Sequence, residues 1–404
     1  MSSILITGIG RLVSYEPDRD DRTAASILCQ DGRVAWVGGD TPPEQAGNDR
    51  IDVGGRCVVP GFVDSHTHLV FAGDRMDEFT ARVAGRAYAA GGINTTVGAT
   101  RAADPAMLTA RVRDLAAEAL RGGTTTLEIK SGYGLSVEDE RRLLDIAGGV
   151  TNETTFLGAH VVPPEYADDP DTYVALVCGP MLDACAPLAA WCDVFCERGA
   201  FDADQSRAVL RAGADRGLGL RVHANQLGHG PGVRLGVELG AASADHCTFL
   251  DRDDIAALAD TETVATLLPT VELATGSPAA PGRTLLDAGA QVALASDCNP
   301  GTSYTTSMAL VIALACHRYR MTPVEALRAA TLGGARALRR DDVGHLRVGA
   351  RADMVVLDAP DPGYLAYRPG VPLVHRVIAG GRLAHPRPAG GSASVAAPGF
   401  QARS

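Results

Sequence analysis

The fold is decided by residues 58–69, which read Val-Val-Pro-Gly-Phe-Val-Asp-Ser-His-Thr-His-Leu. The apolar start of this stretch predicts a buried strand over 58–66. Successive side chains of a strand point to opposite faces, so His66 and His68 would share one face. Two imidazoles on one face form half of a metal site, and neutral imidazole binds Zn, Fe, Ni or Cu. The alternative is a pair of polar residues at a strand end, so the rest of the chain must supply further ligands.

Length and composition limit the class of protein. The chain has 404 residues, 46% of them hydrophobic, which allows one large domain and a small one. Its net charge of −11, without a basic cluster, argues against a nucleic acid or an anionic membrane as partner. The first residues lack the basic and apolar regions of a signal peptide, and nine cysteines without a Cys-x-x-Cys fit a reducing compartment. We therefore expect a cytoplasmic protein.

From residue 58 onward, apolar strands alternate with segments of helical periodicity, which predicts an α/β fold built from βα units. Eight such units over 58–342 match a (β/α)₈ barrel. A doubly wound sheet is the alternative, but the glycine fingerprint after its first strand is missing. The expected strands are 58–66, 124–130, 154–160, 192–197, 219–225, 243–248, 262–268 and 291–297, and the expected helices include 105–121, 137–147, 204–215, 303–315 and 323–338.

The two ends of the chain read differently from its middle. Residues 1–57 contain short strands separated by turns, and 343–385 return to a β pattern with an expected hairpin at 344–358 and a strand at 374–384. We expect these two segments to form one small β-sandwich domain beside the barrel. Residues 386–404 are rich in Pro, Gly, Ala and Ser, which predicts a flexible tail.

Polar residues gather where the expected barrel strands end. Catalytic groups of this fold lie at the C-terminal ends of the strands. Every expected strand except the seventh carries an ionisable residue there, and together they are His66, His68, Lys130, His160, Glu197, His223, His246 and Asp297. Each histidine alone could be a structural residue, but five of the ten histidines on one rim indicate a common purpose.

These residue types predict a mononuclear metal site. A catalytic zinc or iron needs three or four N or O ligands and an open position for water, and His66, His68, His223 and Asp297 supply such a set. His246 and Asp297 are then placed to move protons. The fourth strand ends in Phe-Cys-Glu (195–197), without a lysine to bridge a second metal as a carbamate, which favours one ion.

Lys130 is a further candidate, because it is the only lysine among 37 Lys and Arg residues. Drift in base composition can replace exposed lysines by arginine, but not where a compact ammonium is required. Chance survival is the alternative explanation. We therefore include Lys130 among the candidate catalytic residues.

Several stretches resemble a known family. Pro-Gly-Phe-Val-Asp-Ser-His-Thr-His resembles the first metal motif of the amidohydrolase superfamily, and five more segments are similar to its imidazolonepropionase family: 69–75, 127–135, 158–163, 243–246 and 296–302. The resemblance covers about residues 30–384. It implies hydrolysis of the ring amide of 4-imidazolone-5-propanoate to N-formimino-L-glutamate, with one Zn or Fe per subunit and a possible homodimer.

The resemblance also implies roles for single residues. The metal would be held by His66, His68, His223 and Asp297, while His246 would assist the water. The small anionic substrate would be gripped by Arg75 and Tyr133 and surrounded by His160, Gln226, Asn299, Gly301 and Thr302. Arg75 suits the propanoate arm, because a guanidinium can bind a carboxylate through two parallel hydrogen bonds.

Two positions depart from the family pattern. Gln226 stands where some members carry a Glu that could act as a base, and an amide cannot take up a proton at neutral pH. Residues 270–273 read Thr-Val-Glu-Leu where the family often shows Phe-Tyr, which leaves that wall undefined. Two other functions remain open: a mononuclear deaminase of a heterocyclic base, which Gln226 weakens, and an inactive scaffold, which the complete ligand set weakens.

Overall fold

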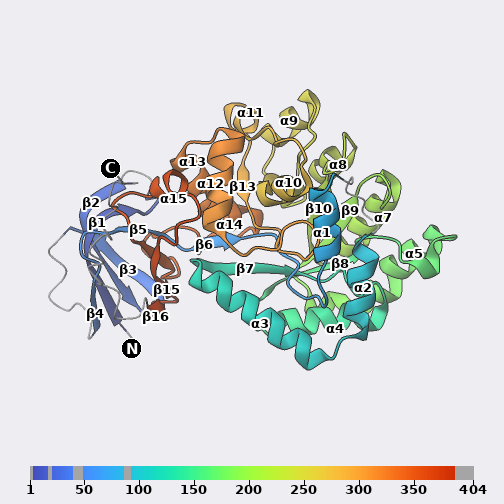
Figure 1. Cartoon of the computed structure of the whole chain (residues 1–404), viewed down its shortest axis with the longest axis horizontal. Coiled ribbons are helices and arrows are strands. Elements are labelled where there is room, and N and C mark those ends of the chain that lie inside the picture. The colour runs from blue at the N-terminus through green and yellow to red at the C-terminus, as the bar shows by residue number, and fades with distance from the viewer. Residues whose placement is uncertain (1–2, 17–20, 40–48, 86–91, 387–404) are drawn as a thin grey trace, which may run out of the picture.

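The computed structural model describes residues 3–16, 21–39, 49–85 and 92–386. Figure 1 shows a helix-surrounded barrel with a smaller β domain beside it. The predicted fold class is confirmed, because all eight strands of the barrel sheet run parallel in the order β13-β12-β11-β10-β9-β8-β7-β6. Of the tail predicted for residues 386–404, Pro386 instead ends a strand, and the rest lies outside the described residues.

The small domain combines both ends of the described chain. Its eight-stranded sheet has the order β16-β15-β14-β5-β1-β2-β3, with β4 paired to β1. Apolar residues of the early and late strands, such as Ile6, Ile27, Met354 and Ile378, form one buried cluster. Neither segment could bury these side chains alone. The strands are β1 Ser3–Val13, β2 Asp21–Gln30, β3 Arg33–Gly38, β4 Asp49–Asp52, β5 Cys57–Pro60, β14 Met354–Leu357, β15 Val374–Ala379 and β16 Arg382–Pro386.

The predicted strand 58–66 is two strands, and this corrects the expected domain boundary. β5 pairs with β14 in the small domain, whereas β6, Phe62–Asp64, begins the barrel. Gly61 lies between them, and a Cβ there would be 2.1 Å from the Thr125 hydroxyl, so the crossing requires glycine. The hairpin expected at 344–358 is also wrong, because β14 finds its partners in β5 and β15.

The remaining barrel strands lie close to the predicted ones. They are β7 Thr124–Lys130, β8 Glu153–Ala159, β9 Trp191–Cys196, β10 Gly219–Ala224, β11 Ser243–His246, β12 Val264–Leu267 and β13 Val292–Leu294. The helices are α1 Met76–Val83, α2 Ile93–Ala102, α3 Pro105–Arg121, α4 Val137–Gly148, α5 Pro170–Leu176, α6 Leu182–Cys185, α7 Ala203–Ala214, α8 Gly232–Glu238, α9 Arg252–Ala259, α10 Pro269–Thr275, α11 Gly282–Asp287, α12 Met308–Tyr319, α13 Pro323–Arg328, α14 Gly334–Ala337 and α15 Tyr364–Tyr367.

Local sequence explains where these helices start and where one prediction fails. Asp104 caps α3, Pro105 occupies its first turn, and Leu108 and Val112 face the core at helical spacing. The helix expected from 303 begins at Met308 instead. Ser303 is held in the loop after β13, because its hydroxyl donates to the Ser296 carbonyl at 2.6 Å.

The barrel closes between its first and last strands at the level of the expected metal ligands. Above β6 and β13, the Asp297 N–H donates to the His66 carbonyl and the His68 N–H to the Cys298 carbonyl, both at 3.0 Å. Lower down, a π-helical turn at 329–333 and the start of α14 cover the seam. The first and last strands thus meet where His66 and Asp297 stand.

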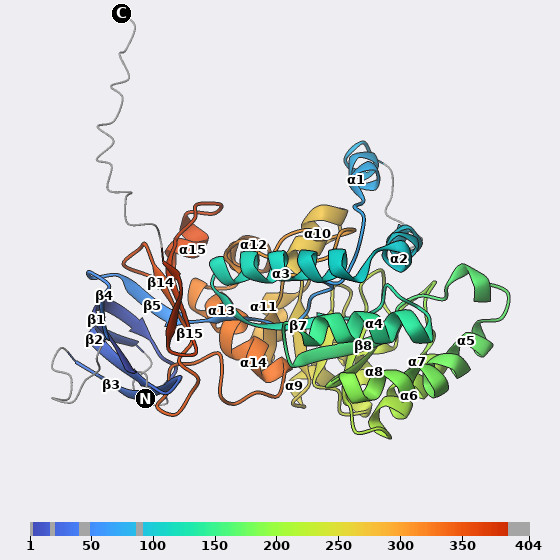
Figure 2. The same cartoon turned by 90° about the horizontal axis from the view of Figure 1, so that it is seen from below.

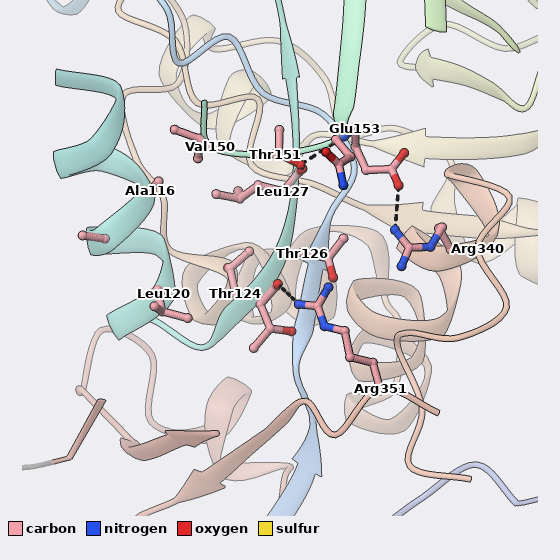
Figure 3. A pocket seen from close by; sticks show the side chains of 13 residues that line it. Ala116, Leu120, Thr124, Thr126, Leu127, Val150, Thr151, Glu153, Arg340 and Arg351 are labelled. Atoms are coloured by element: carbon pink, nitrogen blue, oxygen red, sulfur yellow. Dashed lines mark hydrogen bonds and ion pairs between the residues drawn. The ribbon is translucent and has the colours of Figure 1, made fainter. Parts of the chain in front are cut away.

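A cavity of about 440 Å³ lies at the opposite, N-terminal end of the barrel strands, between α3, β7 and the small domain. Figure 3 shows the side chains that line it. Its two arginines already have partners. Arg351 donates to the Thr125 carbonyl at 2.6 Å, and Arg340 pairs with Glu153 at 2.7 Å. The Arg351 contact joins the small domain to the barrel, and a stabilising role is usual for this face of a barrel. Within the described residues, no helix has the length and apolar character needed to cross a bilayer.

Candidate active site

Four buried side chains converge at the C-terminal end of the barrel. His66 and His68 follow β6, His223 lies in β10, and Asp297 follows β13. The Nε2 atom of His68 is 3.3 Å from His66 Nε2, 3.4 Å from His223 Nε2 and 3.3 Å from Asp297 Oδ1. Ligands at about 2.05 Å from a tetrahedral zinc would stand about 3.3 Å apart, so this spacing suits a metal ion.

The hydrogen bonds behind the histidines decide which nitrogen faces the cluster. His66 Nδ1 lies 2.7 Å from Asp245 Oδ2, and His223 Nδ1 lies 3.0 Å from Asp193 Oδ2. A carboxylate accepts the Nδ1 proton, which leaves the lone pair on Nε2. Once His66 has lost its Nε2 proton, these lone pairs point at each other and at a buried Asp297 oxygen without a hydrogen-bond donor. Such an arrangement is costly unless a cation lies between the atoms, so the donor set fits a metal.

The neighbouring imidazoles are held neutral. Burial lowers the pKa of His68 to about 4 and lowers the pKa of His160 and of His246 well below the usual value. His160 Nδ1 lies 2.9 Å from the Gly132 carbonyl, so it donates there and its Nε2 keeps a lone pair. A neutral His246 is able to accept a proton, as its expected role requires.

Lys130 lies beneath the metal cluster, as we call the four expected ligands His66, His68, His223 and Asp297. It does not line the cavity above them. Its Nζ is 2.9 Å from Glu128 Oε1, 2.9 Å from Asp193 Oδ2 and 3.9 Å from Asp245 Oδ2. Two of these carboxylates also hold the metal-facing histidines. The structure therefore changes the predicted catalytic role of Lys130 to that of a positioning residue.

The sequence reading missed most of this layer of charges. Besides Lys130 it contains Glu128, Asp193 and Asp245, together with Arg221, which donates to the Ser65 carbonyl at 2.7 Å and lies 3.3 Å from Asp245. A signal was present, because Glu128 and Lys130, and Arg221 and His223, are two residues apart on strands and so share the inner face. Charged residues at inward positions of a predicted barrel strand are unusual, and they indicate a buried charge network.

Most of the expected substrate-binding residues line one small cavity above the cluster, of about 30 Å³. They are Arg75, Tyr133, His160, Gln226, Asn299 and Thr302, joined by His68, His223, His246 and Asp297 and by two residues not foreseen, Ile93 and Phe195. Gly301 does not line it; a Cβ at Gly301 would stand 2.1 Å from Arg75 Nη1, so its lack of a side chain gives room to the guanidinium.

Two buried carboxylates hold the loops after the strands: Glu140, which the sequence did not point to, and Glu197, which was expected at the end of the fourth strand. The Glu140 carboxylate accepts the N–H groups of Gly132, Gly134 and Leu135 at 2.8–3.1 Å, which fixes the loop carrying Tyr133. Likewise, Glu197 accepts the Leu227 N–H at 2.9 Å, next to Gln226.

The turn after β13 is braced from within. Asn299 Oδ1 accepts the N–H groups of Gly301 and Thr302 at 2.8 and 2.9 Å, and its Nδ2 donates to the Asp297 carbonyl at 2.7 Å. Asp297 and His246 adopt positive φ values of 50° and 75°, a conformation that costs free energy in non-glycine residues. This backbone strain at both residues aims their side chains at the cluster.

Residues 270–273, where the sequence departs from the family pattern, belong to α10. Thr270 donates to the Ser296 carbonyl at 2.9 Å, and Glu272 is buried, where desolvation raises its pKa to about 7. None of these four residues lines the cavity above the metal cluster. The departure from the family pattern therefore lies beside the site.

Imidazole and carboxylate groups that could hold a metal ion on the C-terminal rim of such a barrel are the mark of a class of metal-dependent hydrolases. The model of the Amidohydrolase family matches residues 57–385, and the chain belongs to this family. Within it, the chain is similar to imidazolonepropionases. It is 61% identical to the Mycolicibacterium smegmatis enzyme, over 95% of this chain and 98% of that one, and 62% identical to the Salinispora arenicola enzyme, over 94% and 98%. The chain is thus an amidohydrolase of the imidazolonepropionase group.

Solved structures show the same fold in more distant proteins. The atrazine chlorohydrolase TrzN variant from Arthrobacter aurescens, complexed with zinc and atraton, aligns with a TM-score of 0.72 at 21% identity, covering 96% of this chain and 97% of that one. A zinc-bound adenosine deaminase from Xanthomonas campestris aligns with a TM-score of 0.72 at 21% identity, over 95% and 92%. At these identities the likeness concerns the fold alone.

Proposed function

We propose that this protein hydrolyses the ring amide of 4-imidazolone-5-propanoate to N-formimino-L-glutamate, using one Zn or Fe ion per subunit. The observation that carries the proposal is the convergence of three imidazole Nε2 atoms and the Asp297 carboxylate beside Arg75. Identities near 60% to imidazolonepropionases over nearly the whole chain support the same substrate.

The roles of the side chains follow from their environment. When bound to His66, His68, His223 and Asp297, the ion would lower the pKa of water and supply a nucleophile near neutral pH. His246, held neutral, accepts a proton and returns it to the leaving nitrogen, because Gln226 in the same cavity cannot.

The cationic side of the cavity orients the substrate. Arg75 binds the propanoate, and Tyr133 and His160 border the ring. The proposed ligand is a small anion, and we propose no nucleic acid or membrane as a partner. We further propose a cytoplasmic location and a homodimer.

The direct test is to incubate the purified protein with imidazolonepropanoate, follow the loss of ring absorbance and identify the product, alongside metal analysis. We expect ring opening and about one Zn or Fe per chain. His66→Ala should lose both metal and turnover. Full activity without metal would refute the mechanism, and ammonia release with an intact ring would favour a deaminase.

Gln226→Glu tests which group is the base. It should leave metal content unchanged and raise the rate little, since His246 already accepts the proton. A large gain in rate would show that His246 is not the main base.

A further inference from the structure

We propose that Glu78 on α1 is a positioning residue for substrate specificity: it presets Arg75 and joins it to Arg82 to form a two-arginine carboxylate subsite. The inference rests on the proposed function and assigns roles to two residues outside the expected set. In Figure 2, α1 stands at the edge of the barrel, away from the body of the molecule. Arg75 directly precedes this helix, and Glu78 and Arg82 lie within it.

One carboxylate links the two guanidinium groups. Glu78 Oε2 accepts a hydrogen bond from Arg75 Nε at 2.7 Å, and its Oε1 accepts one from Arg82 Nη1 at 2.8 Å. Arg82 Nη2 donates to the Gly301 carbonyl at 2.8 Å, which ties α1 to the loop after β13. The arginine side chains are only 3% and 6% exposed, whereas that of Glu78 is 28% exposed.

This geometry fixes which edge of Arg75 meets the substrate. Glu78 takes the edge formed by Nε and Nη2, so the end formed by Nη1 and Nη2 is left for a carboxylate. Two glycines clamp the guanidinium plane: a Cβ at Gly92 would be 2.0 Å from Nη2, and one at Gly301 would be 2.1 Å from Nη1. Among these contacts, Glu78 is the group that holds the Nε edge of Arg75.

Position and charge both suit an anionic arm. Arg75 and Thr302 line the small cavity above the metal cluster and also a neighbouring one of about 570 Å³, to which Arg82 contributes. A substrate crossing from the larger cavity therefore meets Arg75. The two arginines and the partly exposed Glu78 together carry one excess positive charge, which a single substrate carboxylate neutralises. Buried charge without a partner is costly, so the subsite favours ligands with one carboxylate.

Glu78→Asp tests the proposal, because it keeps the charge and shortens the reach between the two arginines. For imidazolonepropanoate we expect KM to rise on the order of tenfold with kcat nearly unchanged, since orientation of a binding group is lost. For the neutral propanamide analogue KM should not change. Glu78→Gln should behave like Glu78→Asp. A fall in KM would overturn the proposal, because it would mean that Glu78 competes with the substrate for Arg75.

A binding readout separates this idea from the proposed function. Calorimetric titration with imidazole-4-propanoate should show the same tenfold loss of affinity in Glu78→Asp, with unchanged metal content and melting temperature. If the wild type opens no ring but binds this ligand through Glu78-dependent contacts, only the proposed function fails. Equal affinities in wild type and variant would overturn the subsite. Glu238→Asp is the matched control, because Glu238 pairs with Arg207 on the surface and should change neither measurement.

Discussion

Lys130 shows how one residue can matter for a site that it does not touch. Its ammonium lies among three buried carboxylates, two of which hold His66 and His223 by their Nδ1 atoms. Burial and the nearby Arg221 both disfavour the charged ammonium, but the attraction of Asp193, Glu128 and Asp245 outweighs them and keeps the pKa of Lys130 above its usual value. Lys130 thus balances charge beneath the metal and fixes the orientation of its ligands.

Lys130→Met should lower the free energy of unfolding by about 3–5 kcal/mol, because it leaves buried carboxylates without a partner. Urea unfolding and metal analysis would measure the effect, and weaker metal retention is expected as well. Lys130→Arg keeps the charge but must fit a larger planar group into a fully buried site. We therefore expect this variant to lose part of its stability and part of its metal retention. Wild-type stability and turnover in Lys130→Arg would mean that the solitary lysine is an accident of composition.

Metal binding should depend on pH through His66. Burial and Lys130 disfavour its protonated form, but Asp245 and Asp297 outweigh them and raise its pKa to about 9 in the metal-free protein. The proton competes with the metal for Nε2 at neutral pH. Apparent affinity should therefore rise with pH, about tenfold per unit, and level off above about 9. Metal titrations between pH 7 and 10 would check this, and a pH-independent affinity would contradict it.

At the level of the elements, the contact between β6 and β13 decides where the expected metal ligands lie. Cβ atoms at Gly333 and Gly334 would lie 2.3 Å from the carbonyl oxygens of Val292 and Val63, one on each strand. The helical segment after the barrel therefore touches both strands through bare backbone. This contact sets their separation, and the strands lead directly to Asp297 and His66.

Gly333→Ala should push this segment away from β13. We expect a loss of about 1–3 kcal/mol in the free energy of unfolding, typical of overpacking, together with weaker metal binding as the ligands shift. Gly98→Ala in α2 is the matched control, because a Cβ there meets nothing within 4 Å. It should stabilise the protein by up to about 1 kcal/mol through helix propensity and leave metal binding unchanged.

At the scale of the whole molecule, the small domain is tied to the barrel end opposite the metal. The Arg351 guanidinium donates to the Thr125 carbonyl of β7 and pairs with Asp353 at 2.6 Å, and Asp353 is nearly fully buried. Stability and catalysis are thereby separated at the two ends of the strands, as is usual in barrels.

Arg351→Met should lower the unfolding free energy by about 1–3 kcal/mol, because Asp353 loses its cationic partner. Metal content and KM should stay at their wild-type values. Thermal unfolding and steady-state kinetics would show the split. Arg216→Met removes a surface pair with Asp183 and a hydrogen bond to the Ala212 carbonyl, and it should cost less than about 1 kcal/mol. A change of KM in Arg351→Met would contradict the separation of the two ends.

The sequence by itself determined the barrel, the flanking β domain and the residues that gather at the metal, because these depend on local patterns. Strand periodicity placed β7 at its observed bounds, and His-x-His, His223 and Asp297 followed from strand ends. The sequence did not predict the bounds of β6, the start of α12 or the pairing of the late strands. These features depend on partners that are distant in the chain.

Only the tertiary structure decided what surrounds the ligands. Whether Lys130 faces the cavity or the barrel interior depends on carboxylates from other strands, and the grip of Glu78 on Arg75 depends on two glycines from separate loops. Hydrogen bonds and charges act between atoms a few ångströms apart, so their partners become known only once the chain has folded. Residue types in a pattern predict the chemistry, and the packing of distant segments decides how each group takes part in it.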